Sequence, residues 1–457
     1  MRWSRSYFAR PAGPAGPAGL ALAALTLSAV AHGQGKAPAK PAAAPAAKAV
    51  APTFTVDMMW PKPLPTHKLL GSVTGVAVDK NDHVFVVHRM DSFTARTETG
   101  ADQTPPIGEC CVSELPVVEF DAAGNRLKSW GGPGPGYEWP AIPAGIAIAP
   151  NGNVWIAAAG GLDGQVLVFT HDGSFIRQIG KAGAAPAPSA PVAADTAYQG
   201  VSPGGRGGAR GAAPAAAGRG GRGGRGGPAP SLPPNSASME LFGGATRISF
   251  DATGATAYIA DGARNRRVVV VDASTGAIKS FFGAYGKAPS DAATPAYAAG
   301  ASPEQFSGVA CARAARDGTV YVCDRNNDRI QAFKADGSFL KEAKVAPATL
   351  GEGSVWDIAF SADPAQKYLY VADGMNQKVR ILDRASLTEL TAFGDGGRVP
   401  GTFYAVHSLA VDSKGNLYTG ETYEGKRVQK FAFKGVGPVT KANQGPLWPA
   451  QAPGGAK

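Results

Sequence analysis

Four acidic residues and one histidine occupy the same place in a repeated sequence pattern. Asp261, Asp324, Asp373 and Glu421 each end an apolar run that follows a turn, and His88 holds this place in the first copy. Such side chains bind ligands and metal ions and transfer protons. An Asp at such a place also caps turns by accepting hydrogen bonds from backbone N–H groups. The sequence leaves both roles open, and we carry these five residues forward as candidate ligand-binding residues.

A second recurring position heads the first expected strand of each copy. In chain order its occupants are Thr74, Ala144, Thr246, Ala310, Trp356 and His407. Within this set, His407 carries the side chain that most commonly binds metal ions. The pattern leaves open whether His407 is a metal ligand or a histidine whose hydrogen bonds are satisfied in the core.

Arg89 follows His88 in a copy that differs from the others. This copy lacks the recurring acid, and a long insertion, 90–116, follows directly. Because an arginine can bind or neutralise an anion, we predict a site role for Arg89. By contrast, we expect Arg264, Arg325 and Arg380 to pair with the recurring acids of neighbouring copies.

The elements that position these residues follow from six copies of one pattern, in which an apolar run, a turn and an aromatic-bearing apolar run succeed one another. The copies span 75–89, 145–159, 247–262, 311–325, 357–374 and 408–422. Further β-branched runs with Asp-Gly or Thr-Gly turns bring each copy to four short strands. One copy cannot bury its own apolar face and must stack on its neighbours. We therefore predict an all-β fold, a six-bladed β-propeller over 53–435 whose last blade is completed by 53–56.

The repeats resemble NHL repeats, and their arrangement resembles the peptidyl-α-hydroxyglycine α-amidating lyase family, a six-bladed propeller. The matching stretches are GVAVDKNDHVFVVHR (75–89), ADGARNRRVVVVD (260–272), CDRNNDRIQAF (323–333) and VHSLAVDSKGNLYTGE (406–421). Stretches at 109–112, 137–139 and 421–431 also resemble bacterial relatives. The likeness covers about 53–435 apart from the insertions.

The resemblance implies a zinc ion held by three histidines at positions that correspond to Ala144, Ala310 and His407. Two of the three are alanines here, which cannot bind zinc, and a catalytic site needs about three protein ligands. The resemblance also implies a catalytic arginine, which is retained as Arg89. In the family, the metal lowers the pKa of a substrate hydroxyl and the arginine neutralises the developing oxyanion.

Two further family positions have changed. The family's tyrosine, which accepts the proton, falls at Ala263, and Tyr423 occupies the equivalent place in the last repeat and is a candidate substitute. The Asp that helps to hold calcium in the family is Ser408 here. We therefore expect both the zinc and the calcium site to be degraded, with His407 the one retained zinc-ligand position.

The two long insertions and the cysteines lie outside the common pattern. We expect 90–116, with the adjacent Cys110 and Cys111, to lie over one mouth of the channel. The other insertion, 182–235, is rich in Gly, Arg, Ala and Pro and is predicted to be disordered. Cys311 and Cys323 flank a hairpin turn symmetrically, so they either form a disulfide or remain as two buried thiols. An oxidised Cys110–Cys111 pair would form a stiff apolar knob.

The chain carries a formal net charge of +10 over 457 residues, but the excess lies in 1–52, 182–235 and 436–457. The repeat region is therefore nearly neutral, and we expect no nucleic-acid partner despite GRGGRGGRGG at 218–227. Arginines followed by a short apolar run and Ala29-Val30-Ala31 predict a signal peptide over 1–31. An Ala/Pro/Lys linker (32–52) and a flexible tail (436–457) complete the predicted organisation. The protein is expected to be exported, periplasmic or secreted, without a membrane span.

The sequence leads to three functional hypotheses. The first is a binding propeller whose channel mouth, with Arg89, His407, Glu421 and Tyr423, holds a polar or anionic small molecule, a peptide or a glycan. The second is an active lyase or lactonase-type hydrolase with a rearranged metal site, such as His88, His407 and Glu421. The third is a platform for a partner protein.

Overall fold

The computed structural model describes residues 49–94, 97–183, 230–294 and 296–449. All of them belong to one compact unit, which begins at Lys48. The expected signal peptide, most of the expected linker and insertion 182–235, and the end of the expected tail lie outside the described residues.

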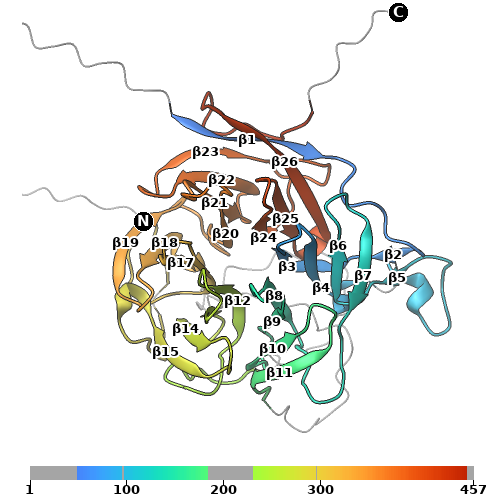
Figure 1. Cartoon of the computed structure of the whole chain (residues 1–457), viewed down its shortest axis with the longest axis horizontal. Helices are drawn as coiled ribbons and strands as arrows, with labels where there is room; N and C mark the ends of the chain where they lie inside the picture. Colours follow the sequence, from blue (N-terminus) through green and yellow to red (C-terminus); the bar gives the residue numbers. More distant parts are fainter. Residues whose placement is uncertain (1–48, 95–96, 184–229, 295, 450–457) are drawn as a thin grey trace, which may run out of the picture. The chain divides into compact units, whose positions relative to one another are not determined.

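The predicted all-β, six-bladed propeller is confirmed, because six four-stranded antiparallel sheets surround a common axis in this unit (Figure 1). Blades one to three consist of β3 (Ser72–Val78), β4 (Val84–Arg89), β6 (Val117–Phe120) and β7 (Arg126–Trp130); β8 (Pro143–Ile148), β9 (Val154–Ala158), β10 (Gln165–Phe169) and β11 (Phe175–Gly180); and β12 (Ala245–Phe250), β13 (Thr256–Asp261), β14 (Arg267–Asp272) and β15 (Ile278–Phe282).

Blades four to six complete the ring. They consist of β16 (Val309–Ala314), β17 (Val320–Asp324), β18 (Arg329–Phe333) and β19 (Phe339–Lys344); β20 (Asp357–Phe360), β21 (Tyr368–Asp373), β22 (Lys378–Asp383) and β23 (Glu389–Phe393); and β24 (Val406–Val411), β25 (Leu417–Glu421), β26 (Arg427–Pro438) and β1 (Val50–Asp57). The described helices are five three-residue 3-10 turns, η1 (Met90–Ser92), η2 (Gly100–Asp102), η3 (Ala284–Gly286), η4 (Arg325–Asn327) and η5 (Tyr423–Gly425). No helix in the described parts of the chain has the length and apolar character that a membrane crossing requires.

The core lies between neighbouring blades. In β4 and β21 every residue is buried, because both faces of each second strand pack against an adjacent sheet. Such strands show continuous apolar runs instead of alternation. One shared cluster joins Phe85 of blade one to Ile156 and Phe169 of blade two. Each blade is therefore stable only with its neighbours in place.

The ring is closed by the two ends of the propeller sequence. β1 pairs antiparallel with β26 from Val50 opposite Pro438 to Asp57 opposite Lys430, so the strand expected at 53–56 does complete blade six. This pairing satisfies the edge that β26 would otherwise expose. Residues after β26 continue along blade five, where the amide of Ala392 donates to the carbonyl oxygen of Ala442.

The 90–116 insertion has a different position from the expected one. Its strand β5 (Val112–Ser113) pairs in parallel with β2 (Lys68–Leu69). Figure 1 places this pair beside blade one and away from the axis, so this part of the insertion does not cover the channel. The structure also contains two disulfides, Cys110–Cys111 and Cys311–Cys323. The second joins directly opposed residues of β16 and β17, as the symmetric spacing about the turn allows.

Removing the aromatic anchor of the closing strand should weaken the whole ring. Phe54 is buried, and its ring centroid lies 5.6 Å from that of Tyr370 and 5.7 Å from that of Phe393. We expect Phe54→Ala to lower the free energy of unfolding by about 3–5 kcal/mol, measured by urea denaturation. Thr55→Ala, on the other face of β1, is the control and should change it by less than about 1 kcal/mol. Equal effects of the two variants would contradict a closing role for the buried face.

Candidate functional site

Each innermost strand presents one residue to the axis, and a β-bulge is the usual device. In five blades the register between the first and second strands shifts at this residue, which is Thr74, Ala144, Thr246, Ala310 or His407. In blade five Trp356 directly precedes β20. A bulge re-aims the side chain that it carries. As the alignment of the repeats predicts, all six residues line one cavity on the axis.

The cavity is small and basic. Among the described residues, eleven line it, and none of them is acidic. Besides the six axial residues, these are Arg89, Arg247, Arg325, Thr422 and Tyr423. Its free volume is about 20 Å³, room for roughly one water molecule. Three arginine side chains therefore line a cavity whose described lining residues include no carboxylate.

Arg247 crosses the axis and joins four blades. Its Nη2 donates to His407 Nδ1 (2.8 Å) and to the carbonyl oxygen of His407 (3.0 Å), and its Nη1 donates to the carbonyl oxygens of Ala144 (2.5 Å) and Thr246 (2.9 Å). Gly145 makes room for it, since a Cβ there would lie 3.2 Å from Arg247 Cδ and 2.6 Å from the carbonyl oxygen of Thr246. Burial lowers the pKa of Arg247 to about 10, so the guanidinium stays charged at neutral pH.

Asp357 balances this charge and closes the tunnel. Its carboxylate accepts from Arg247 Nε (3.4 Å) and from Arg313 Nη2 (2.7 Å), and also from the amides of Ile358 and Leu409. Burial opposes its ionisation, but the two arginines hold its pKa below the usual value. Arg313 lines a wider funnel of about 690 Å³ at the other end of the innermost strands. The Arg247–Asp357–Arg313 bridge therefore separates the small cavity from the funnel.

His407 is neutral, and its Nδ1 has two partners. Burial and the charges of Arg247 and Arg325 keep its pKa well below the usual value. Arg247 Nη2 can only donate to Nδ1, whereas the carbonyl oxygen of Thr74, 3.1 Å from the same nitrogen, can only accept, so the two contacts favour opposite tautomers. The residues present do not fit the family's zinc ion: Ala144 and Ala310 offer no side-chain donor, and a guanidinium already bonds His407 Nδ1. Nor does Ser408 offer the carboxylate of the family's calcium site.

The other two arginines of the cavity are anchored by acids outside it. Arg89 forms two hydrogen bonds to Asp91, of 3.0 Å from Nε and 2.6 Å from Nη2. Arg325 donates to Glu352 (2.6 Å), and its guanidinium carbon lies 3.9 Å from the ring centroid of Trp356. These pairs fix the two side chains at the cavity wall.

Tyr423 shares the wall with Arg325, to which it is hydrogen-bonded. Burial raises the pKa of the Tyr423 phenol, although Arg325 acts in the opposite direction. The phenol is therefore protonated at neutral pH. Both residues predicted to be catalytic, Arg89 and Tyr423, thus lie at the same cavity as His407.

The recurring acids lie elsewhere. Asp261, Asp324, Asp373 and Glu421 are fully buried and absent from the cavity wall, and each accepts a hydrogen bond from an arginine of the third strand in its own blade. The arginines are Arg267, Arg329, Arg380 and Arg427, at 2.7–2.9 Å. In three blades the acid also accepts a hydrogen bond from the backbone amide of the residue three positions before the axial residue. These residues are Gly243, Ser307 and Tyr404. The geometry supports a turn-capping role and gives the predicted ligand-binding role no support.

His88 performs the capping role in blade one. Its Nδ1 accepts from the amide of Gly71 (3.1 Å), and its Nε2 lies 2.9 Å from the carbonyl oxygen of Leu115. Burial lowers its pKa to about 4. Both ring nitrogens are therefore occupied, as are both oxygens of Glu421. The structure does not bring His88, His407 and Glu421 together as the metal site of the second hypothesis.

Blade two has Ala158 in place of the acid, and Asp163 replaces it by accepting from the amides of Ala141 and Ile142.

The expected ion pairs of three arginines need correction. Arg264 bonds the carbonyl oxygens of Gly160 and Asp163, and Arg325 points to the axis, so neither pairs with a recurring acid as expected. Arg380 does pair with Asp373, but within its own blade.

Sequence reasoning missed Arg247, Arg325 and Thr422 as cavity residues. A signal for Arg247 existed one position after each axial residue. That column holds Gly75, Gly145, Arg247, Cys311, Asp357 and Ser408. An arginine and an aspartate among small residues, two blades apart, are matched in charge and reach across the axis. Arg325 gave no such signal, because Asp-Arg is equally consistent with a local ion pair.

Comparisons with known proteins assign no family to this chain. No family model matches the chain, and no curated protein matches it. One similar solved structure is a protein of unknown function from Bacteroides thetaiotaomicron, with 14% identity, a TM-score of 0.44, and coverage of 80% of this chain and 70% of that one. Another is a streptogramin B lyase, with 9% identity, a TM-score of 0.43, and coverage of 84% of this chain and 98% of that one.

The buried histidines should make the protein less stable in mild acid. His88 and His407 are neutral in the folded state because burial lowers their pKa values, whereas an unfolded histidine titrates near 6.5. Below that pH the unfolded chain binds protons that the folded chain does not. Each histidine then lowers the free energy of unfolding by up to about 1.4 kcal/mol per pH unit. Urea denaturation between pH 6.5 and 5 should show a shallower slope for His88→Gln, and an unchanged slope would contradict this assignment.

Loss of the axial carboxylate should be costly. Asp357→Asn leaves Arg247 and Arg313 buried without their counter-ion, so we expect the free energy of unfolding to fall by about 3–5 kcal/mol. The control is Asp317→Asn, which weakens the ion pair of 2.7 Å between the half-exposed Asp317 and Arg384 and should cost less than about 1 kcal/mol. Chemical denaturation of both variants measures the difference, and a similar small cost for both would show that the bridge does not support the fold.

Proposed function

We propose that this propeller is a binding protein for a small anion, or for the carboxylate or phosphate end of a larger molecule, in the axial cavity. The observation that carries the proposal is the meeting of Arg89, Arg247 and Arg325 at a cavity wall without acidic residues. Arginine binds carboxylate and phosphate groups through charge-assisted hydrogen bonds. The five N–H groups of Arg247 are already bonded within the protein, so Arg247 contributes only its charge to the site. The acids that neutralise these arginines, Asp91, Asp357 and Glu352, stand behind them and leave the cavity positive.

The size of the cavity limits the ligand. With about 20 Å³ free, the cavity as it stands admits about one oxygen atom of the anionic group, and the rest of a small molecule, peptide or glycan remains outside. The hydroxyl groups of Thr422 and Tyr423 and the imidazole of His407 are the neutral polar groups that complete such a site. The cavity therefore favours a compact anion over a neutral ligand of similar size.

A lyase of the amidating type is the second candidate, because Arg89 and Tyr423 lie at one cavity. Two features count against it. The zinc-ligand positions are alanines at 144 and 310, and Tyr423 is a protonated phenol, which can donate a proton but not accept one at neutral pH. We therefore place the binding function first.

We also propose that the protein is exported, since two disulfides suit an oxidising compartment and 1–31 has the composition of a signal peptide.

Titration calorimetry at low ionic strength tests the binding function with matched probes. We expect acetate and inorganic phosphate to bind and acetamide, which has nearly the shape of acetate without its charge, to give no heat of binding. Arg325→Gln should weaken anion binding by about 10–100-fold, the loss expected for one charge-assisted hydrogen bond. Arg384→Gln, which alters an arginine paired with Asp317 outside the cavity, is the control.

The outcomes separate the two candidates. Equal binding of acetate and acetamide, or equal weakening by both arginine variants, would refute an anion site on the axis. Turnover of an α-hydroxyglycine peptide that is lost in Arg89→Gln and Tyr423→Phe would favour the lyase. Thermal melts of each variant establish that the fold is retained.

A further inference from the structure

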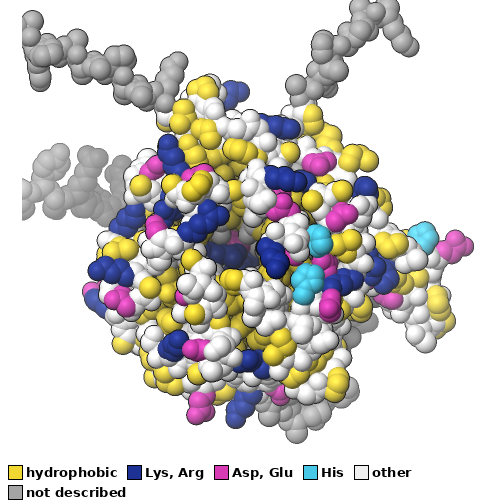
Figure 2. All heavy atoms as spheres, in the orientation of Figure 1, with side chains coloured by type: hydrophobic (Ala, Val, Ile, Leu, Met, Phe, Trp, Pro, Cys, Tyr) yellow, Lys and Arg dark blue, Asp and Glu magenta, His cyan; other side chains and the backbone are white. Residues whose placement is uncertain are grey.

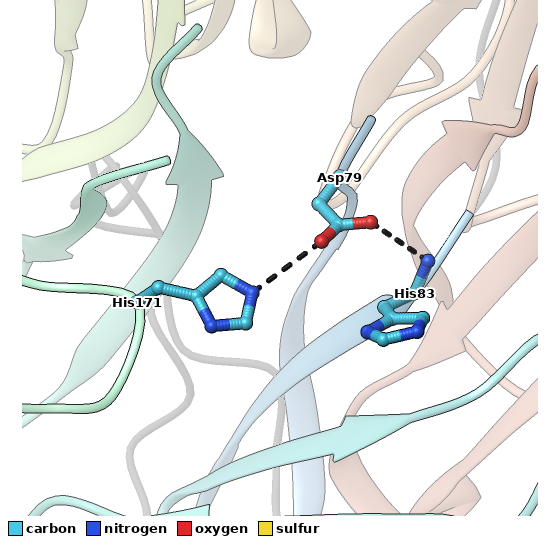
Figure 3. Close-up of side chains that lie close together, drawn as sticks. All are labelled: Asp79, His83 and His171. Atoms are coloured by element: carbon cyan, nitrogen blue, oxygen red, sulfur yellow. Dashed lines mark hydrogen bonds and ion pairs between the residues drawn. The ribbon is translucent and has the colours of Figure 1, made fainter. Parts of the chain in front are cut away.

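Two histidines and two carboxylates gather at the seam between blades one and two, away from the axial cavity. Asp79 and His83 flank the turn between β3 and β4, Glu119 lies in β6, and His171 lies in the turn between β10 and β11. Figure 3 shows Asp79 between the other two, with His171 reaching toward it from blade two. In Figure 2, His and acidic side chains lie side by side between the central hollow and the rim.

The donor atoms have the separations of a metal site. Single ligand atoms of Asp79, His83 and His171 all lie within 4.8 Å of one another. His171 Nε2 lies 3.4 Å from Asp79 Oδ2 and 3.7 Å from Glu119 Oε1. Ligands at about 2.0–2.2 Å from a tetrahedral zinc ion are about 3.3–3.6 Å apart. The hydrogen bond of 2.8 Å between His83 Nδ1 and Glu119 Oε1 would have to lengthen by about 0.6 Å.

The local fold holds these groups in place. Asp79 Oδ1 accepts from the backbone amides of Asn81 and His83, each at 2.8 Å, which leaves Oδ2 directed at His171. The His171 ring packs edge-on against Phe85, with centroids 5.1 Å apart. A pocket of about 140 Å³ lined by Asp79, Asn81 and His171 gives solvent access. These supports orient the donors before any ion binds.

The charge of the cluster is not balanced by its neighbours. The side chains of Asp79 and Glu119 are 4% and 2% exposed. Among the described residues, Lys128 is the basic side chain in contact with this group, and its Nζ lies 3.4 Å from Glu119 Oε2, an oxygen without a hydrogen bond. The same ammonium contacts the exposed Asp172 at 2.7 Å. Of the two buried carboxylates, Glu119 contacts this lysine, which also contacts Asp172 and His171 Nδ1 (3.4 Å), and a divalent cation would supply the missing charge.

We propose that Asp79, His83, Glu119 and His171 bind a divalent metal ion of the zinc class. Two imidazoles and two carboxylates suit zinc and its first-row neighbours better than calcium or magnesium, which prefer oxygen ligands throughout. The ion would connect the β3–β4 turn and β6 of blade one to the β10–β11 turn of blade two, so its role is to brace this seam. The 140 Å³ pocket gives the ion access from solvent.

Isothermal titration of the full chain with Zn²⁺ in a buffer that does not chelate metals tests the proposal. We expect one ion per chain and a higher melting temperature with zinc, since a ligand bound only by the folded state stabilises it. His171→Gln should weaken binding at least about 100-fold, more than the loss of an outer-sphere partner. His67→Gln, which removes an exposed imidazole from the same blade region, is the matched control.

A spectroscopic readout guards against a variant that is simply unstable. Co²⁺ bound to wild type and to His67→Gln should give the visible absorption of a tetrahedral nitrogen and oxygen site, and His171→Gln and His83→Gln should lose it while retaining their β-sheet circular dichroism. Zinc binding that is the same in His171→Gln and wild type, or stabilisation by Ca²⁺ equal to that by Zn²⁺, would overturn the proposal.

Discussion

The contact between Arg247 and Asp357 across the axis is the interaction on which the rest of the site depends. A guanidinium with almost no exposure to water is stable only when its charge is compensated and its N–H groups are bonded. Asp357 supplies the charge, and His407, Ala144 and Thr246 supply the acceptors. Arg313 binds the same carboxylate from the funnel side. The three residues thus close the tunnel and make the small cavity at its end positive.

This arrangement also explains why the surroundings of His407 do not fit the zinc site that a resemblance to amidating lyases implies. Arg247 occupies one ring nitrogen of His407 and lowers the histidine's proton affinity. The guanidinium of Arg247 therefore already contacts a histidine nitrogen that a metal ion would need as a free ligand. Arg89 and Tyr423 lie at the same cavity, but one fold carries many functions, so their presence alone does not define a lyase.

Arginine has two different roles in this propeller, and the local acid distinguishes them. Arg267, Arg329, Arg380 and Arg427 pair with a buried acid of their own blade and hold the turn before the axial residue. Blade one replaces this acid with neutral His88, and blade two with Asp163. Arg89, Arg247 and Arg325 instead have acids placed behind them and face the axis. The cluster at Asp79, Glu119, His83 and His171 has the opposite charge balance, an excess of carboxylate, and so favours a cation.

The sequence by itself determined the repeat count, the strands, the ring of axial residues, the closing strand and the alignment of Cys311 with Cys323. These features follow from periodic burial and from turns, which are local properties that recur in each copy. Tertiary structure alone decided which charged groups meet. Arg247 and His407 are 160 residues apart, and His171 reaches Asp79 from 92 residues away. An arginine next to an acid in sequence can turn to its own blade, to the next blade or to the axis. The packing of neighbouring blades selects among these directions, because each buried charge must find its partner in the space that the blades leave.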